Sequence, residues 1–178
     1  MRQGAAGSIF DPPPREMSRA EFVKKFGGVY EHFPEIAAAA FDRGLTTAED
    51  TPAGLAAAMA SVAAALGEAE KLALIRNHPD LAGKAAIAGE LTEASRSEQA
   101  RAGLANCTPE EFRRFQELNA AYKQKFGFPF ILAVGGRHRR EILAAFEVQI
   151  ERDRDLEFRT ALAEIDKIAR LRLEAMAR

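Results

Sequence analysis

The sequence predicts an all-α fold: a single-domain helical bundle with one irregular, extended segment near residues 126–136. Alanine is abundant, aromatic residues make up only 8% of the chain, and the period-two alternation of apolar and polar residues typical of β-strands is nearly absent. Apolar residues spaced by three and four positions therefore indicate the buried faces of helices.

Four helices are expected in the first half of the chain, at 19–26, 35–43, 52–66 and 68–76. Ser18 can cap the first helix, and Thr51 followed by Pro52 marks the start of the third, since proline fits a first turn where its missing N–H is not needed. The fourth helix is expected to stop before Pro79. Proline within a helix costs about 3 kcal/mol and disfavours helical geometry at the residue before it, here His78.

Four more helices are expected in the second half, at 91–104, 109–126, 139–152 and 155–176. The best-marked start is at Thr108, which can act as cap while Pro109 fills the first position and Glu111 completes a capping box. The stretch "FGFPFILAVGG" at 126–136 differs from its surroundings because it is aromatic, β-branched and bracketed by glycine. With Pro129 in its middle, it is predicted to be extended or irregular.

Length and composition limit the classes to which the protein can belong. A chain of 178 residues is expected to form one helical domain at 18–178, preceded by a flexible, glycine- and proline-rich lead-in at 1–17. A net charge of −1 gives no reason to expect nucleic acid or an anionic membrane as partner. One cysteine excludes an internal disulfide and a cysteine-cluster metal site, and the N-terminus lacks a secretory apolar core, so a cytoplasmic location is expected.

The motif "NHPD" at 77–80 places one of three histidines at a break between helices. It has two interpretations. It is a turn in which Asn77 and Asp80 make local backbone bonds, or it holds the imidazole of His78 on a stiff backbone as a catalytic base. The second is chemically reasonable because histidine, with an ordinary pKa of about 6.5, exchanges protons near neutrality.

Ser95, Glu98 and Gln99 form a second candidate group, because positions i, i+3 and i+4 share one face of a helix. A hydroxyl, a carboxylate and an amide together could bind the urea-like edges of a small polar molecule. The alternative is a capping box in which Ser95 starts the helix and Glu98 reaches back to it. That alternative leaves Gln99 without a role.

Two further features are open to more than one interpretation. Arg172 lies on the apolar line of the last helix, so its guanidinium must either extend to water or meet an anion such as a carboxylate. The segment 126–136 carries backbone N–H and C=O groups that need partners. It could meet a planar, hydrogen-bonding ligand or be a buried connector held by its own phenylalanines.

Several stretches together resemble one family, that of the 2-oxo-4-hydroxy-4-carboxy-5-ureidoimidazoline (OHCU) decarboxylases. They occur in order and cover nearly all of the chain from about residue 18: "GGVYEHFPEIA", "RNHPDLAGK", "LTEASRSEQARAGL", "ELNAAYKQKFGFPFILAV" and "ALAEIDKIARLRLEAM". The chain departs from the family pattern at Glu35, where tryptophan is common, and at Gly135, where a basic residue is common.

The resemblance implies an all-α homodimeric enzyme that needs no cofactor. It would be a carboxy-lyase converting OHCU to (S)-allantoin and CO2, the last step of urate degradation. Its partner would be this small molecule, without nucleic acid or membrane. The alternatives are a non-catalytic helical interaction module and an inactive relative.

The resemblance also implies roles for particular residues. The catalytic residues would be His78 and Glu98, and the substrate-binding residues would be Pro79, Ser95, Gln99, Phe128, Phe130, Ile131, Leu132 and Arg172. Arg170 lies close to Arg172, and the family's arginine could correspond to either. No metal ligand is implied.

Overall fold

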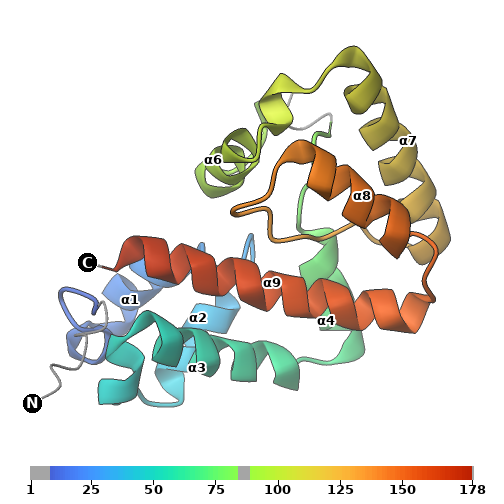
Figure 1. Ribbon diagram of the computed structural model, residues 1–178. Helices are drawn as coiled ribbons and strands as arrows, with labels where there is room; N and C mark the ends of the chain where they lie inside the picture. Colours follow the sequence, from blue (N-terminus) through green and yellow to red (C-terminus); the bar gives the residue numbers. More distant parts are fainter. Residues whose placement is uncertain (1–8, 84–88, 178) are drawn as a thin grey trace, which may run out of the picture. The chain divides into compact units, whose positions relative to one another are not determined.

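A computed structural model describes residues 9–83 and 89–177 of the chain (Figure 1). Its α-helices and short 3-10 helices (η) are, in chain order, η1 (Pro14–Glu16), α1 (Arg19–Phe26), α2 (Glu35–Asp42), η2 (Thr47–Asp50), α3 (Pro52–Ala65), α4 (Glu68–Arg76), α6 (Glu93–Arg101), η3 (Leu104–Asn106), α7 (Pro109–Phe126), α8 (Arg139–Gln149) and α9 (Arg154–Met176). No β-strand occurs in these two ranges, so the predicted all-α fold class is confirmed.

Local capping chemistry sets most helix starts. The side chains of Ser18, Thr51 and Thr108 each accept a hydrogen bond from a backbone N–H in the first turn of α1, α3 and α7. Each cap satisfies one of the N–H groups that a helix start leaves without an internal partner. These three starts agree with the prediction. Helix α6 starts later than predicted, because Thr92 caps it and Glu93 is its first residue.

The chain divides into two compact units, unit 1 at residues 1–70 and 166–178 and unit 2 at residues 71–165. In unit 1, α1 packs against α2 and α2 against α3. The core of this unit contains the fully buried side chains of Phe22, Phe26, Leu55 and Met59. On α3 the apolar side chains of Leu55, Met59 and Val62, spaced by three and four positions, are all buried.

The predicted lead-in at 1–17 lies partly outside the described residues, which begin at residue 9. From there the chain packs onto unit 1: Phe10 is only 1% exposed, and its ring lies 5.0 Å from that of Phe26. The amide of Phe10 donates to the carbonyl oxygen of Asp50 at 3.0 Å, and Arg15 pairs with the carboxylate of Asp50 at 2.9 Å. Burial of one aromatic side chain thus anchors residues 9–17, although the sequence around them is rich in proline.

Unit 2 is built around a cluster of aromatic rings. Tyr122 of α7 lies within 4.4–6.0 Å of the rings of Phe126, Phe128, Phe130 and Phe146, measured between ring centroids. Its hydroxyl donates to Glu157, and burial together with this bond raises the pKa of the phenol well above its ordinary value. The cluster joins α7, α8 and the segment after α7 into one core.

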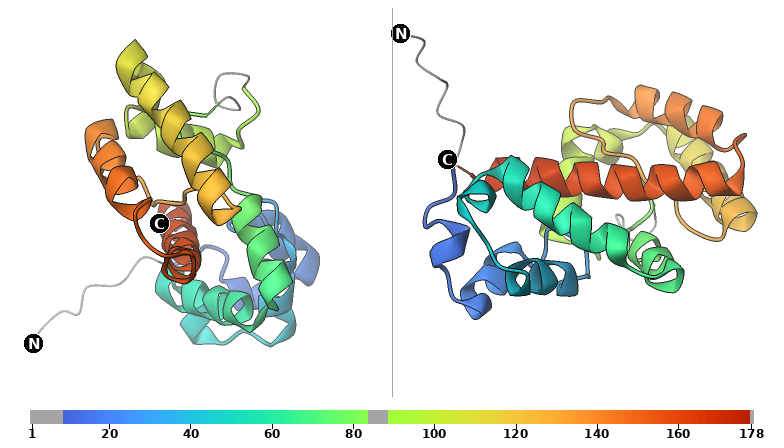
Figure 2. Two further views of the ribbon diagram at one scale, coloured as in Figure 1. Left: turned by 90° about the vertical axis from the view of Figure 1, so that its right-hand side faces the viewer. Right: turned by 90° about the horizontal axis from the view of Figure 1, so that it is seen from below.

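Both connections between the units lie inside helices. Helix α4 contains the boundary between residues 70 and 71, and α9, a helix of 23 residues, contains the boundary between 165 and 166 (Figure 2). Domain boundaries usually fall in exposed, flexible linkers rather than inside helices. The single domain at 18–178 remains a prediction.

Candidate active site

His78 lies at the break that ends α4. The amides of Asn77 and His78 still donate to the carbonyl oxygens of Ala73 and Ile75, and Pro79 then prevents continuation of the helix. The imidazole is buried, with 7% of the residue exposed, and its Nδ1 lies 3.1 Å from the carbonyl oxygen of Leu74. Because a carbonyl can only accept, Nδ1 carries the proton, and Nε2 bears the lone pair of the neutral ring.

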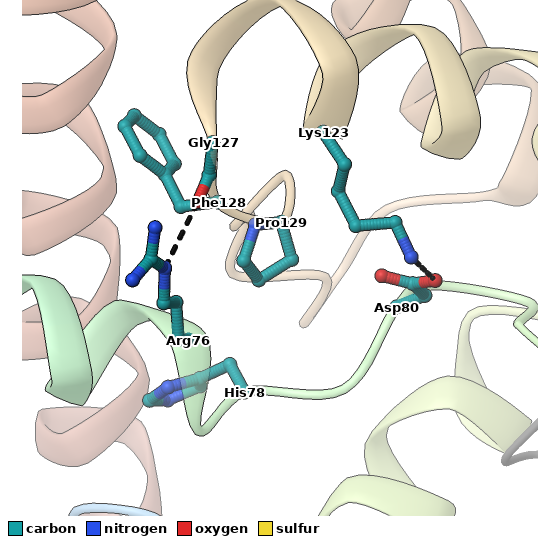
Figure 3. Close-up of a pocket in the computed structure, with 7 residues that line it drawn as sticks. All are labelled: Arg76, His78, Asp80, Lys123, Gly127, Phe128 and Pro129. Atoms are coloured by element: carbon teal, nitrogen blue, oxygen red, sulfur yellow. Dashed lines mark hydrogen bonds and ion pairs between the residues drawn. The ribbon is translucent and has the colours of Figure 1, made fainter.

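A pocket with a volume of about 330 Å³ is lined by residues from α4, from α7 and from the turns that follow them (Figure 3). Its lining residues are Arg76, His78, Asp80, Lys123, Gly127, Phe128 and Pro129.

Two polar contacts organise this pocket (Figure 3). Arg76 donates from Nε to the carbonyl oxygen of Gly127 at 2.9 Å, and Lys123 pairs with Asp80 at 2.7 Å. The first contact ties the end of α4 to the end of α7. The pocket therefore contains an imidazole together with positively and negatively charged groups, an arrangement suited to a small polar molecule that gains or loses protons.

Helix α6 carries the predicted Ser–Glu–Gln group. Since Thr92 is the cap, Ser95 lies inside the helix and does not start it, which removes the capping-box alternative. Ser95 and Gln99 are buried, and Glu98 is partly exposed. None of the three is among the residues that line the pocket in Figure 3.

Gln99 is nevertheless connected to the segment that carries His78. Its Oε1 accepts from the amide of Ala82 at 3.1 Å, and its Nε2 donates to the carbonyl oxygen of Asp80 at 3.3 Å. A carboxamide can accept two hydrogen bonds and donate two, so these contacts use half of its capacity. The structure thus assigns Gln99 an additional role, to hold the residues that follow Pro79.

Residues 127–136 form neither helix nor strand, as predicted. The side chains of Phe128, Phe130, Ile131 and Leu132 are buried, and the amide of Ala133 donates to Glu164 of α9 at 2.7 Å. Within the described residues, no acceptor is found for the amides of Phe130, Ile131 and Leu132. The segment thus combines a fixed apolar side with a row of main-chain donors.

Arg172 belongs to unit 1, where it is buried with 9% of the residue exposed. It donates to the carboxylate of Glu31 at 2.9 Å and to the carbonyl oxygen of Val29 at 3.3 Å. Of the two sequence alternatives, the guanidinium therefore meets an anion and does not extend to water. Arg170 is exposed and pairs with Glu174 one turn further along α9.

Sequence reasoning missed several residues that shape this region. They are Arg76, Gln116, Asn119, Lys123 and Glu164. Only Asn119 had a visible signal, since it is a polar residue on the apolar stripe formed by Phe115, Leu118 and Tyr122.

Two kinds of site are absent from residues 9–83 and 89–177. These residues contain no group of three or more His, Cys, Asp or Glu arranged to hold a metal ion. They also contain no helix long and apolar enough to cross a membrane.

The fold and the site define a small helical enzyme that places an imidazole in a pocket, beside a segment carrying main-chain donors. Comparison with known proteins makes this class specific. The chain belongs to the OHCU decarboxylase family, whose profile matches residues 15–174. The resemblance stated from the sequence is thereby confirmed.

Individual relatives agree with this membership. A 2-oxo-4-hydroxy-4-carboxy-5-ureidoimidazoline decarboxylase from Halalkalicoccus jeotgali is 38% identical over 161 residues, which is 90% of this chain and 88% of the relative. The protein of the same name from Mus musculus is 37% identical over 158 residues, covering 88% of this chain and 86% of that one.

Solved structures share the fold. One described as (S)-allantoin synthase superposes with a TM-score of 0.72 at 30% identity. The superposition covers 92% of this chain but only 52%, about half, of the (S)-allantoin synthase chain. Another, described as OHCU decarboxylase in the presence of (S)-allantoin, superposes with a TM-score of 0.64 and covers 80% of this chain and 89% of that one. At 24% identity, this second likeness concerns the fold alone.

Proposed function

We propose that this chain decarboxylates OHCU to (S)-allantoin and CO2, the last step of urate degradation, without a cofactor. The observation that carries the proposal is the histidine at the end of α4. Its Nδ1 is bonded to the carbonyl oxygen of Leu74, so the neutral ring has its basic nitrogen at Nε2, and His78 lines a pocket of suitable size. Family membership and the names of the relatives support the same reaction.

The chemistry requires one proton to leave and another to be added. The C4–carboxylate bond breaks, CO2 departs, and the electron pair spreads into the imidazoline ring. His78 takes the proton of the C4 hydroxyl or orients the departing carboxylate, and a proton returns to carbon from one side to set the (S) configuration. A general acid–base role of this kind contributes about 10²–10⁴-fold in rate.

The remaining candidates bind and orient the substrate. Glu98 fixes the ureido arm, and Ser95 and Gln99 meet the ureido and ring groups, Gln99 through the half of its hydrogen-bonding capacity that the 80–82 contacts leave. The main chain at Phe128, Phe130, Ile131 and Leu132 donates to the ring, which fits the amides found without an acceptor among the described residues. Preorganised donors of this kind stabilise charge as it develops.

Arg172 holds a carboxylate or a ring oxygen of the substrate, and Pro79 shapes the turn that carries the histidine. Burial favours Arg172 over Arg170, whose side chain is 61% exposed and engaged with Glu174. We further propose that the protein is a homodimer of the cytoplasm, with OHCU as its partner and without nucleic acid or membrane. The near-neutral charge supports the absence of a polyanionic partner.

The decisive experiment generates OHCU in the cuvette from urate and follows the circular dichroism of allantoin as it appears. We expect the wild-type protein to accelerate formation of the (S) enantiomer and His78→Ala to remove this acceleration while far-UV spectra stay unchanged. His138→Ala is the matched control, since that histidine is exposed and caps α8. A His78→Ala variant with the wild-type rate would reject the mechanism, and a wild-type protein without effect would favour the non-catalytic alternative.

A further inference from the structure

Residues 80–82, called here the 80–82 loop, follow directly on His78 and Pro79 and are held by side chains of α7. Gln116 donates from Nε2 to the carbonyl oxygen of Ala82 at 2.7 Å, and Asn119 donates from Nδ2 to the carbonyl oxygen of Leu81 at 3.0 Å. Residues three apart share one face of a helix, so a single face of α7 reaches two successive carbonyls. Asn119 is only 4% exposed, so its bond is made away from water.

The same face of α7 continues to Lys123, whose ammonium pairs with the carboxylate of Asp80 at 2.7 Å. Helix residues 116, 119 and 123 thus contact loop residues 82, 81 and 80 in turn, with the helix and the loop running in opposite directions. From α6, Gln99 adds bonds to the amide of Ala82 and to the carbonyl oxygen of Asp80. Every residue of the loop is therefore bonded to a helix side chain.

The loop needs these bonds because its backbone is not regular. Ala82 has φ of +49°, in the left-handed region that residues with a Cβ atom seldom adopt. Within the described residues, no backbone–backbone hydrogen bond reaches Asp80, Leu81 or Ala82. The side-chain amides of α6 and α7 thus take the place of the backbone partners that a helix or a sheet would supply.

We propose that Gln116 and Asn119 are positioning residues that fix the imidazole of His78 through the 80–82 loop. On one side His78 is tied to α4 by its Nδ1 bond to Leu74. On the other side only Pro79 separates it from the loop, and the proline ring fixes φ, so a shift of the loop is passed to the histidine. This inference rests on the proposed function for its kinetic consequence but not for its structural one.

The test compares Gln116→Ala and Asn119→Ala with Gln124→Ala. Gln124 is an exposed residue of α7 for which no bond is found among the described residues, which makes it a matched control. Nitrogen-15 NMR of the imidazoles is the first readout. The chain has only three histidines, and the signals of His78 are assigned from their absence in His78→Ala. We expect the wild type to show a proton on Nδ1, and the two loop variants to show a shifted or mixed tautomer signal.

Steady-state kinetics is the second readout. Small misplacements of a reacting group cost up to about 100-fold in rate, so we expect kcat to fall roughly 10–100-fold while KM changes little. A loss of packing that merely lowered stability would not produce that split or move the His78 signals in the folded protein. Gln124→Ala is expected to match the wild type in both readouts.

Failure of the positioning proposal can be distinguished from failure of the proposed function. If Asn119→Ala fails to fold, Gln116→Ala, at a partly buried position, carries the test. Unchanged His78 signals in the folded loop variants would overturn the proposal, as would shifted signals with an unchanged kcat. Wild-type activity in His78→Ala would instead reject the proposed function, while the NMR result would still report whether the loop holds the ring.

Discussion

Glu98 and Gln99 are consecutive residues of α6, yet their surroundings differ. Gln99 is buried with its amide bonded to the 80–82 loop, whereas Glu98 is partly exposed and is proposed to bind the ureido arm. Glu98→Gln keeps the shape of the side chain and removes its charge. A hydrogen bond to a charged group contributes about 1.5–3 kcal/mol, so we expect kcat/KM to fall by about 10–100-fold, as measured by the allantoin assay.

Glu93→Gln provides the control for this prediction. Glu93 lies in the first turn of the same helix, is exposed and precedes Glu98 by five positions. Its substitution changes the charge of α6 by the same amount and should leave kcat/KM close to that of the wild type. An unchanged kcat/KM in Glu98→Gln would remove this carboxylate from the mechanism.

Arg172 and Arg170 lie on one helix and can be separated by experiment. Removing one partner of a buried ion pair costs about 3–5 kcal/mol, because the other charge is left behind. Arg172→Met should therefore destabilise the protein strongly through Glu31, while Arg170→Met, at an exposed pair, should cost no more than about 1 kcal/mol. Urea denaturation measures both.

The activities of variants at Arg172 and Arg170 decide which of the two arginines binds the substrate. Arg172→Lys keeps the positive charge but loses the bidentate hydrogen bonding by which a guanidinium binds a carboxylate. Assayed well below its melting temperature, it should show a raised KM, and Arg170→Lys should not. The opposite pattern would assign the substrate contact to Arg170.

At the scale of elements, Glu111 links the starts of two helices. Its carboxylate accepts from the amide of Thr108 at the start of α7 and from Arg139 and Arg140 in the first turn of α8. These contacts, the backbone bond from Thr108 first and then the bond from Arg139, lower the pKa of Glu111 to about 2. The folded form thus releases this proton more readily than the unfolded chain does.

The sign of the pH effect follows from this lowered pKa. Between the ordinary pKa of 4.5 and about 2, the unfolded chain binds the proton more tightly, so the stabilisation from Glu111 is present above this range and is lost as pH falls through it. We expect Glu111→Gln to melt at a lower temperature than the wild type at pH 6, and the difference to shrink toward pH 2. A difference that stays constant with pH would contradict this assignment.

The bounds of the helices could be predicted because the residues that start or end a helix are close to it in sequence. A cap, a first-turn proline or a helix-ending glycine lies within a few residues of the end that it marks, and α1, α3 and α7 begin where these signals predicted. Helix α6 was predicted less accurately, because its start was placed at residue 91, whereas Thr92 caps the helix and Glu93 is its first residue.

The partners of the site residues could not be predicted, because they are distant in sequence. Asn119 meets Leu81 across 38 positions and Arg172 meets Glu31 across 141, and no periodic pattern specifies such pairs. His78 and Gln99 were identified as candidates by residue type and motif alone. Their connection through the 80–82 loop required coordinates.

At the scale of the whole molecule, the two units are joined in an unusual way for separate domains. Neither boundary is a proline- or glycine-rich linker, since one lies within α4 and the other within α9. A helix is cooperative, because each residue adds to hydrogen bonds already formed. We therefore expect the chain to unfold as one domain.

Calorimetry tests this expectation with one core variant in each unit. Met59→Ala in unit 1 and Phe146→Ala in unit 2 each remove a fully buried side chain, at a cost of about 2–5 kcal/mol. If the protein is one cooperative domain, both variants shift a single transition whose calorimetric and van't Hoff enthalpies agree. Two transitions, each moved by only one of the variants, would instead show that residues 18–178 form two domains that unfold independently.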